Sequence, residues 1–351
     1  MDYLYFLYLN LLEKFHIPAF VGTVTFPVLP FCIVAVVLIL VVLFLVLLER
    51  KVLAVFTQRK GPNRVGPWGL FQIIADAIKL LCKENITPEK SDRFLFMIAP
   101  LLAFVPVMVV WGLIPFSSEF DFISYSVSGL LFISIASIPI IAILLAGYAS
   151  NNKYSLIGSI RSVVQAISYE LPMVFSFLSI VLLASSMNLK QIVFAQISIY
   201  PFCGWFIFPA FLGFVVMFIC ALAELNRCPF DLPEAESELV SGYNTEYSGM
   251  RFAFFFLAEY AMAFIMCAFL ATLFLGGFLS PLGFYISEKI FGYNTLSQIL
   301  VYFEQVFWIF LKTFALFICI LWVRATLPRL KSDQLNAFAW KFLLPVSILN
   351  L

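Results

Sequence analysis

Long apolar segments constrain this chain more than any other feature of its sequence. A helix that crosses a bilayer needs about 20 mostly apolar residues. Lipid cannot satisfy backbone polar groups, so a segment of this kind forms a helix unless it belongs to a closed barrel, and no strand-like alternation is evident. With 63% hydrophobic and 12% charged residues, an ordinary soluble domain is excluded. The sequence therefore predicts an all-α polytopic membrane protein, a single membrane domain over residues 1–351 with eight spans. These lie near residues 28–48, 94–116, 127–150, 162–185, 203–225, 252–275, 304–324 and 331–351.

Lysine and arginine are distributed unequally between the two sides of these spans. Nine lie between the first two spans, and seven more lie in later loops on the same side. The opposite side holds only Lys14, Lys190 and Lys289. Because basic loops stay on the inner side, we expect them to face the cytoplasm or matrix and both termini to face the other compartment.

The first inner loop contains a candidate interfacial helix at residues 68–81. Its apolar residues recur at helical spacing and basic residues flank it, as in helices that lie in the membrane surface. Such a helix could simply rest on lipid headgroups. It could also edge an opening through which a lipid-soluble molecule enters sideways, and Asp76 on its polar side favours this second interpretation.

Three glutamates lie within or at the edge of consecutive spans. Glu170 follows Arg161 by nine residues and Glu259 follows Arg251 by eight, which places them about 13 and 12 Å into the bilayer. Glu224 closes the fifth span. Carboxylates are costly at such depths and usually serve ion or proton movement. The alternative is that each is hydrogen-bonded within the bundle or protonated.

The loop after Glu224 is also acidic. Asp231 and Glu234 have the spacing of a capping box, and Glu234 and Glu238 would share a helix face. Capping does not explain Glu236, Glu238 or Glu246. Grouped acids titrate jointly, so the sequence predicts a proton-handling cluster. Lys312, within the seventh span, is either a counter-ion with a structural role, which we favour, or a member of a relay.

Other chemistries lack a signal. Seven scattered cysteines without a CxxC motif and a single histidine make metal, iron–sulfur and haem sites unexpected. A net charge of +1 gives no reason to expect nucleic-acid binding. No signal or transit peptide is visible in the first 26 residues.

Four stretches of the chain resemble the H-subunit family of the proton-pumping NADH–quinone oxidoreductases (respiratory complex I), whose mitochondrial members are called NADH dehydrogenase subunit 1. They are Glu49-Arg50-Lys51 through Gly61-Pro62-Asn63-Arg64-Val65-Gly66-Pro67 and Ala75-Asp76; Ser150-Asn151-Asn152-Lys153-Tyr154 through Ser168-Tyr169-Glu170; Ala223-Glu224 through Glu246-Tyr247-Ser248-Gly249; and Ala258-Glu259-Tyr260. With the eight predicted spans, the resemblance covers nearly the whole chain.

The resemblance implies a subunit without a redox centre or covalently bound cofactor, with no catalytic residue acting in this chain alone. FMN and iron–sulfur clusters would belong to partner subunits, and ubiquinone would be the substrate. The implied partners are membrane lipid, the hydrophilic subunits of the quinone chamber, small membrane subunits and antiporter-like subunits. The quinone-binding positions would be Glu49, Arg50, Arg59 and Arg324. The proton-coupling positions would be Asp76, Glu170, Glu224, Arg227, Asp231, Glu234, Glu236, Glu238, Glu246 and Glu259.

The chain departs from the family pattern at Lys331-Ser332, before Asp333-Gln334-Leu335, where an aromatic residue and arginine are common. The third span contains no acid, so a relay there would use water or side chains such as Ser134 and Ser137.

The resemblance predicts a core subunit of complex I that helps form the quinone chamber and couples quinone reduction to proton translocation. The alternatives are the homologous subunit of a ferredoxin-dependent or hydrogenase-type membrane complex, a stand-alone cation/proton transporter, or an inert membrane anchor. Forty-two phenylalanines and the lack of a presequence favour the mitochondrial inner membrane over a bacterial plasma membrane.

Overall fold

A computed structural model describes the chain except for residues 1–18, 120–124, 200–203, 234–239, 282–284 and 286–294. It divides into two compact units, residues 1–41 and 42–351. In the first unit, the described residues form the beginning of helix α2 (Ala19–Phe56). The features discussed below belong to the second unit.

Within the described ranges the secondary structure is entirely helical, as the apolar segments predicted. Short helical turns occur at Pro67–Gly69 and Gly242–Asn244, and a π-helical turn at Ala339–Leu343 joins the last two helices. After α2 the helices are α3 (Gln72–Cys82), α4 (Arg93–Leu113), α5 (Ser128–Ala136), α6 (Ile138–Ala149), α7 (Lys153–Ala184), α8 (Leu189–Ile199), α9 (Phe211–Glu224), α11 (Gly249–Phe274), α13 (Thr295–Thr326), α14 (Ser332–Phe338) and α15 (Leu344–Asn350).

Five helical stretches in the described part are long and apolar enough to cross a membrane: Arg93–Leu113, Ser128–Ala149, Lys153–Ala184, Gly249–Phe274 and Leu300–Thr326. They match the predicted second, third, fourth, sixth and seventh spans. The first predicted span falls within α2, the fifth corresponds to the 14-residue α9, and the eighth comprises α14, the π-helical turn and α15. The count of eight and the interfacial position of residues 68–81 remain predictions, although α3 is helical as expected.

The third span is not continuous, because α5 ends at Ala136 and α6 begins at Ile138. Pro139 has no backbone N–H to donate to Ile135, so the helix ladder is interrupted at this point. The hydroxyl of Ser137 donates to the carbonyls of Ile133 and Ser134 and satisfies part of the broken turn. The apolar segment 127–150 predicted one uninterrupted span, and the break at Pro139 was not foreseen.

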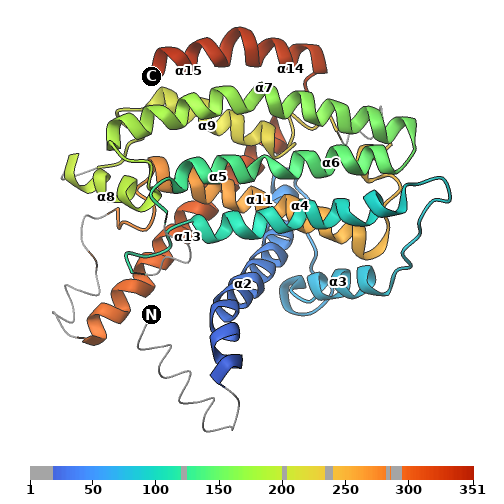
Figure 1. The fold of residues 1–351 in the computed structure, drawn as a ribbon, viewed down its shortest axis with the longest axis horizontal. Coiled ribbons are helices and arrows are strands. Elements are labelled where there is room, and N and C mark those ends of the chain that lie inside the picture. The colour runs from blue at the N-terminus through green and yellow to red at the C-terminus, as the bar shows by residue number, and fades with distance from the viewer. Residues whose placement is uncertain (1–18, 120–124, 200–203, 234–239, 282–284, 286–294) are drawn as a thin grey trace. The chain divides into compact units, whose positions relative to one another are not determined.

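The helix that carries Glu170 begins nine residues before its predicted span. The side chain of Asn152 accepts from the backbone N–H of Tyr154 and caps the first turn of α7. The first nine residues of α7 include polar side chains, so they did not belong to the apolar segment that predicted the span. Polar side chains are nevertheless compatible with a helix. Figure 1 shows α7 beside α6 and α9, and α11 beside α4 and α13.

Small residues and aromatic rings hold these helices together. Lipid is as apolar as a helix surface, so close van der Waals packing rather than water exclusion drives association within a membrane. A Cβ on Gly147 of α6 would lie 2.1 Å from the hydroxyl oxygen of Ser159 on α7, so only glycine permits this approach. Phe132 and Phe269 stack with ring centroids 3.8 Å apart and join α5 to α11.

Lys312 of α13 closes the end of α11. Its buried ammonium donates to the carbonyls of Leu275, Gly277 and Leu279 at 2.6 to 2.9 Å. These carbonyls belong to the turn that follows the last residue of α11, and a cation at this end complements the helix dipole. The contacts agree with the favoured structural role of Lys312.

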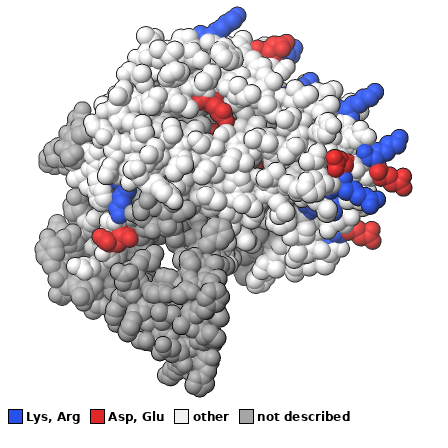
Figure 2. All heavy atoms as spheres, in the orientation of Figure 1, with Lys and Arg blue, Asp and Glu red and all other residues white. Residues whose placement is uncertain are grey.

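Basic side chains gather at one end of the helices. Figure 2 shows most of the visible Lys and Arg side chains on the side of the view where α4 and α7 begin. This arrangement agrees with the one-sided charge distribution of the sequence.

Candidate functional site

Arg227 is the centre of a buried cluster of charged residues. It follows α9 in the loop after Glu224, and only 5% of its surface is exposed. Its Nη1 lies 3.1 Å from Oε1 of Glu49 on α2, and its Nε lies 3.2 Å from Oε1 of Glu259 on α11. The guanidinium also lies over the ring of Tyr260, 4.4 Å from its centroid. The cluster thus joins the end of α9 to α2 and α11.

Arg324 of α13 completes the cluster, because its Nη1 also pairs with Glu49. Removing a charged group from water is costly unless it is paired. Burial lowers the pKa of Arg227, but the carboxylates of Glu259 and Glu49 outweigh burial and raise it, so the guanidinium stays charged. Two arginines thus share Glu49, and two glutamates share Arg227.

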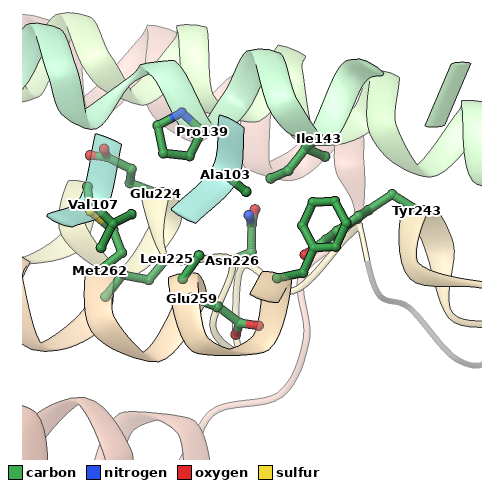
Figure 3. Close-up of a pocket in the computed structure, with 12 residues that line it drawn as sticks. Ala103, Val107, Pro139, Ile143, Glu224, Leu225, Asn226, Tyr243, Glu259 and Met262 are labelled. Carbon is green, nitrogen blue, oxygen red and sulfur yellow. The ribbon is translucent and has the colours of Figure 1, made fainter. Parts of the chain in front are cut away.

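Two cavities flank this cluster. The smaller has a volume of about 60 Å³ and is lined by Glu224, Glu259 and Asn226, together with apolar side chains of α4, α6 and α11. The larger has a volume of about 230 Å³ and is lined by Arg227, Asp231 and Arg324, among others. Asn226 and Glu259 line both cavities. Figure 3 shows Glu224 and Glu259 on different sides of the smaller cavity, with Asn226 near its middle in this view.

The cavities contain polar atoms that protein groups leave unsatisfied. Both carboxyl oxygens of Glu224 are buried and have no hydrogen-bond partner in the part of the chain that the structure describes. The same is true of Nη2 of Arg227 and Oδ1 of Asp231. A water molecule needs a space of about 10–15 Å³ and two to four polar partners. The smaller cavity therefore has room for a short chain of water molecules beside Glu224 and Glu259.

Glu170 of α7 extends this set of acids. Its charge interacts with that of Glu224, and the side chain of Ser137 lies near its carboxyl group. Its Oε1 is buried without a hydrogen-bond partner among the described residues. Ser137 is one of the polar residues expected to take the place of an acid in the third span, and it lies at the break between α5 and α6. Glu170 thus acts electrostatically on Glu224, and Glu224 shares the smaller cavity with Glu259.

Asp76 and Asp231 each pair with an arginine. Asp76 accepts from Nη1 of Arg50 at 2.6 Å and from Gln72 at 3.2 Å. Burial opposes ionisation of Asp76, but these bonds and the charge of Arg50 outweigh it and lower the pKa of Asp76. Asp231 pairs with Arg329 at 2.9 Å.

Glu246 lies close to the beginning of α7. It accepts a hydrogen bond of 2.8 Å from the side chain of Asn152, the residue that caps this helix. The pairing brings the end of the acidic loop to the helix that carries Glu170. Asn152 belongs to one of the stretches that carry the family resemblance, but the sequence analysis assigned it no role.

The structure unites only part of the predicted quinone-binding set. Glu49 and Arg324 meet in the buried cluster, whereas Arg50 pairs with Asp76 and Arg59 is exposed. Glu234, Glu236 and Glu238 lie outside the described residues, and so does the expected capping box of residues 231–234. Sequence reasoning also missed Asn226 and Tyr260, although each directly follows or precedes a residue that it selected.

An apolar groove lies between α2 and the loop before α3. It has a volume of about 380 Å³, and Lys51 lies 5.8 Å from the ring centroid of Trp68 at its edge. Trp68 was in the predicted interfacial segment, but its part in a groove could not be inferred from helical spacing. The lining residues are Phe44, Leu47, Leu48, Lys51, Val52, Trp68 and Leu70.

The structure offers no group of three His, Cys, Asp or Glu side chains placed to hold a metal ion, as far as the described residues extend. The charged and amide groups that line the two cavities are carboxylates, guanidinium groups and carboxamides. Such a set can bind and release protons and stabilise nearby negative charge.

Comparison with known proteins identifies the family. The family model for NADH dehydrogenase matches residues 29–351. Bacterial proteins named as the H subunit of NADH-quinone oxidoreductase are similar along most of their length. The protein of Brevibacillus brevis is 48% identical over 304 residues, which cover 86% of this chain and 84% of the relative. That of Dehalococcoides mccartyi is 46% identical over 308 residues, covering 87% and 79%, and that of Bacillus cytotoxicus is 46% identical over 307 residues, covering 87% and 86%.

Because these relatives are bacterial, they give no support to the expected preference for the mitochondrial inner membrane. The family model and the relatives agree with each other and with the resemblance noted in the sequence. The chain therefore belongs to the NADH dehydrogenase family whose members include the H subunit of NADH-quinone oxidoreductase.

Proposed function

We propose that this chain is the core membrane subunit of a proton-translocating NADH–quinone oxidoreductase, catalytic only within that complex. Family membership supports the assembly and its activity. The observation that carries the coupling role is the pair of cavities that share Asn226 and Glu259. They place unsatisfied acids next to a charged cluster whose partners can be exchanged.

Quinone is the substrate in this proposal, and FMN and iron–sulfur clusters reside in partner subunits. The apolar groove at Trp68 suits the lipid-soluble tail of a quinone. The head would approach the side where Glu49, Arg50, Arg59 and Arg324 supply charge. Reduction of a quinone to a quinol adds two electrons and requires two protons, so negative charge develops at the head before protons arrive. Arginine side chains stabilise this charge.

Coupling follows from the way the buried charges share partners. Negative charge near Arg324 competes with Glu49 for that guanidinium, and Glu49 then draws more strongly on Arg227. Arg227 compensates Glu259 less well as a result, and Glu259 gains affinity for a proton. Water in the smaller cavity would let that proton exchange with Glu224, and Glu170 continues the series.

The energy required for each step is moderate. Moving one charge across a membrane potential of 100 mV takes about 2.3 kcal/mol, and one pKa unit corresponds to about 1.4 kcal/mol. A rearrangement that changes proton affinity by about one to two pKa units per step is therefore sufficient. Loss or gain of one charged partner in a buried site produces changes of this size.

The other acids and partners have places in the same scheme. Asp76 would form the loop-side entrance, and Asp231, Glu234, Glu236, Glu238 and Glu246 would supply protons from the inner side. Hydrophilic subunits would close the quinone chamber over this side. The change in protonation of Glu170, Glu224 and Glu259 would be passed on to small membrane subunits and antiporter-like subunits. The chain would operate in an energy-converting membrane, bacterial or mitochondrial.

Replacement of Glu224 by glutamine tests the proposal. The variant would be introduced into the intact complex and reconstituted in vesicles, and protons pumped per NADH oxidised would be measured with quinone as acceptor. Glu224→Gln keeps the shape of the side chain but cannot accept a proton as a base, so we expect the ratio of pumped protons to electrons to fall. Glu89→Gln, at an exposed acid, is the matched control. An unchanged ratio in Glu224→Gln would refute the coupling role.

A further inference from the structure

Gln165 is a buried glutamine that the proposed mechanism does not use. It lies on α7, and only 1% of its surface is exposed. Its Nε2 is within 2.6 Å of the carbonyl oxygen of Ala223, 2.9 Å of that of Phe230 and 3.2 Å of Oδ1 of Asn226. Backbone carbonyls can only accept, so the amide nitrogen must face them, and the orientation of this amide follows from its partners.

The partners of Gln165 lie on either side, in the sequence, of the residues that form the buried site. Ala223 immediately precedes Glu224, and Phe230 follows Arg227 by three residues. The carbonyl of Ala223 belongs to the last turn of α9 and also accepts from the backbone N–H of Asn226 at 3.2 Å. One side chain of α7 thus fastens both ends of the segment that holds Glu224, Asn226 and Arg227.

A second contact from α7 supports the same attachment. Tyr169 lies one helical turn after Gln165, so both side chains project from one face of the helix. The ring of Tyr169 meets that of Phe230 edge to face at 5.4 Å, and its hydroxyl donates to the carbonyl of Leu335. Tyr169 holds Phe230 by packing, while Gln165 holds its backbone. Both restrict the loop after α9.

The contact with Asn226 connects Gln165 to the cavities. Asn226 lines both of them and has a left-handed backbone conformation, with φ of 49°. A residue other than glycine adopts this conformation only where its surroundings hold it. Both oxygens of Glu224, two residues earlier, have no protein hydrogen bond from the described residues to fix them. The position of Glu224 therefore depends on how firmly its backbone is anchored.

We propose that Gln165 is a positioning residue, which holds the segment from Ala223 to Phe230 so that Glu224, Asn226 and Glu259 stay in register around the shared cavities. The inference rests on the proposed function of the glutamates and assigns Gln165 no proton of its own. Without the amide donors, the segment retains its backbone bonds but loses its attachment to α7. Misplacement of a reacting group by about 1 Å can reduce a rate by up to about 100-fold.

Two substitutions separate positioning from general structure. Gln165→Leu removes the donors at every pH. Gln165→Glu keeps the shape, but its ionised form turns acceptor oxygens toward three other acceptors, whereas its protonated form donates one hydrogen bond. We expect Gln165→Leu to lower the ratio of protons pumped to NADH oxidised. Gln165→Glu should do so at alkaline pH and recover toward the wild-type ratio in mild acid.

Gln196 provides a matched control within the same chain. It is also 1% exposed, and its Nε2 donates to the carbonyls of Thr272 and Leu273 near the end of α11. It therefore fastens a helix end in the same way, but it lines neither cavity that holds the glutamates. Gln196→Glu should leave the ratio, and its dependence on pH, as in the wild type.

The measurements would be made on the intact complex in vesicles, with the amount of assembled complex determined by native electrophoresis. If Glu224→Gln lowers the ratio but neither Gln165 variant does so at any pH, the inference is wrong and the proposed function stands. If Glu224→Gln has no effect, the proposed function itself fails. Equal pH profiles for Gln165→Glu and Gln196→Glu would contradict positioning. Failure of the Gln165 variants alone to assemble would assign this residue to folding instead.

Discussion

Replacement of Arg227 by methionine should destabilise this protein far more than loss of an exposed arginine. Arg227 is 5% exposed and compensates Glu49 and Glu259, while Arg50 pairs with Asp76 with 45% of its side chain exposed. Breaking a buried ion pair from one side costs about 3–5 kcal/mol, because a buried charge is left without a partner. An exposed pair contributes only about 0–1 kcal/mol. The two variants should therefore differ by about 2–5 kcal/mol.

The assay is thermal unfolding of the purified complex in detergent, followed through the loss of this chain from the assembly. Arg227→Met should leave the assembly at a clearly lower temperature than Arg50→Gln, which should behave almost as the wild type. Addition of Glu49→Leu and Glu259→Leu to Arg227→Met removes the uncompensated charges. Arg324, with one third of its side chain exposed, can then be hydrated. Much of the stability should return, since apolar replacements of buried ion pairs are often neutral or stabilising.

The triple variant also separates stability from coupling. It should assemble well but pump few protons, because the charges that respond to quinone reduction are gone. Equal unfolding temperatures for Arg227→Met and Arg50→Gln would refute the reasoning, since the cluster would then behave as if it were in water. Continued pumping by a stable triple variant would show that the cluster serves the fold alone.

Two further predictions concern Asp76 and Lys312. Burial opposes ionisation of Asp76, but Arg50 and Gln72 outweigh it and lower the pKa of Asp76 below its ordinary value of 3.8. The ionised carboxylate therefore contributes fully to stability above pH 3.8, and this contribution is lost only as the pH falls through the lowered pKa. Arg50→Gln should shift that loss to higher pH, which hydrogen–deuterium exchange of α3 amides would detect as earlier acid opening; identical profiles would contradict it. Lys312→Met should lower the unfolding temperature, because hydrogen bonds to a charged group contribute about 1.5–3 kcal/mol each. It should leave protons pumped per electron unchanged, whereas a fall in that ratio would assign Lys312 to the relay.

Much of the architecture was predictable because the causes are local in the sequence. Apolar length defines a membrane helix regardless of its neighbours, and five described helices match predicted spans. Asn152 has the side chain of an N-cap, and Pro139 has the missing N–H of a helix break, so both features were visible before the structure was known. The break was overlooked because hydropathy averages over the whole segment and does not record one lost hydrogen bond.

The grouping of site residues could be predicted only in part. Predicted depth in the bilayer marked Glu170, Glu224 and Glu259 as unusual. In the structure Glu224 and Glu259 line one cavity, and the charge of Glu170 acts on Glu224. The sequence could not show that Arg227 would bind Glu49, 178 residues earlier in the chain. Nor could it show that Arg50, which the resemblance placed in the quinone-binding set, would pair with Asp76. Pairing of this kind depends on how helices pack, which no local pattern records.

The sequence alone determined that this protein is helical and belongs in a membrane, and it predicted acids in the inner half of that membrane. These properties follow from the solvation of single segments, which depends on composition and length. Only the tertiary structure decided which acids have partners and which have none among the described residues, that Asn226 and Glu259 join two cavities, and that Gln165 fastens the loop between them. Those properties arise from the packing of distant helices, because a carboxylate acquires its character from whatever the fold places within a few ångströms of it.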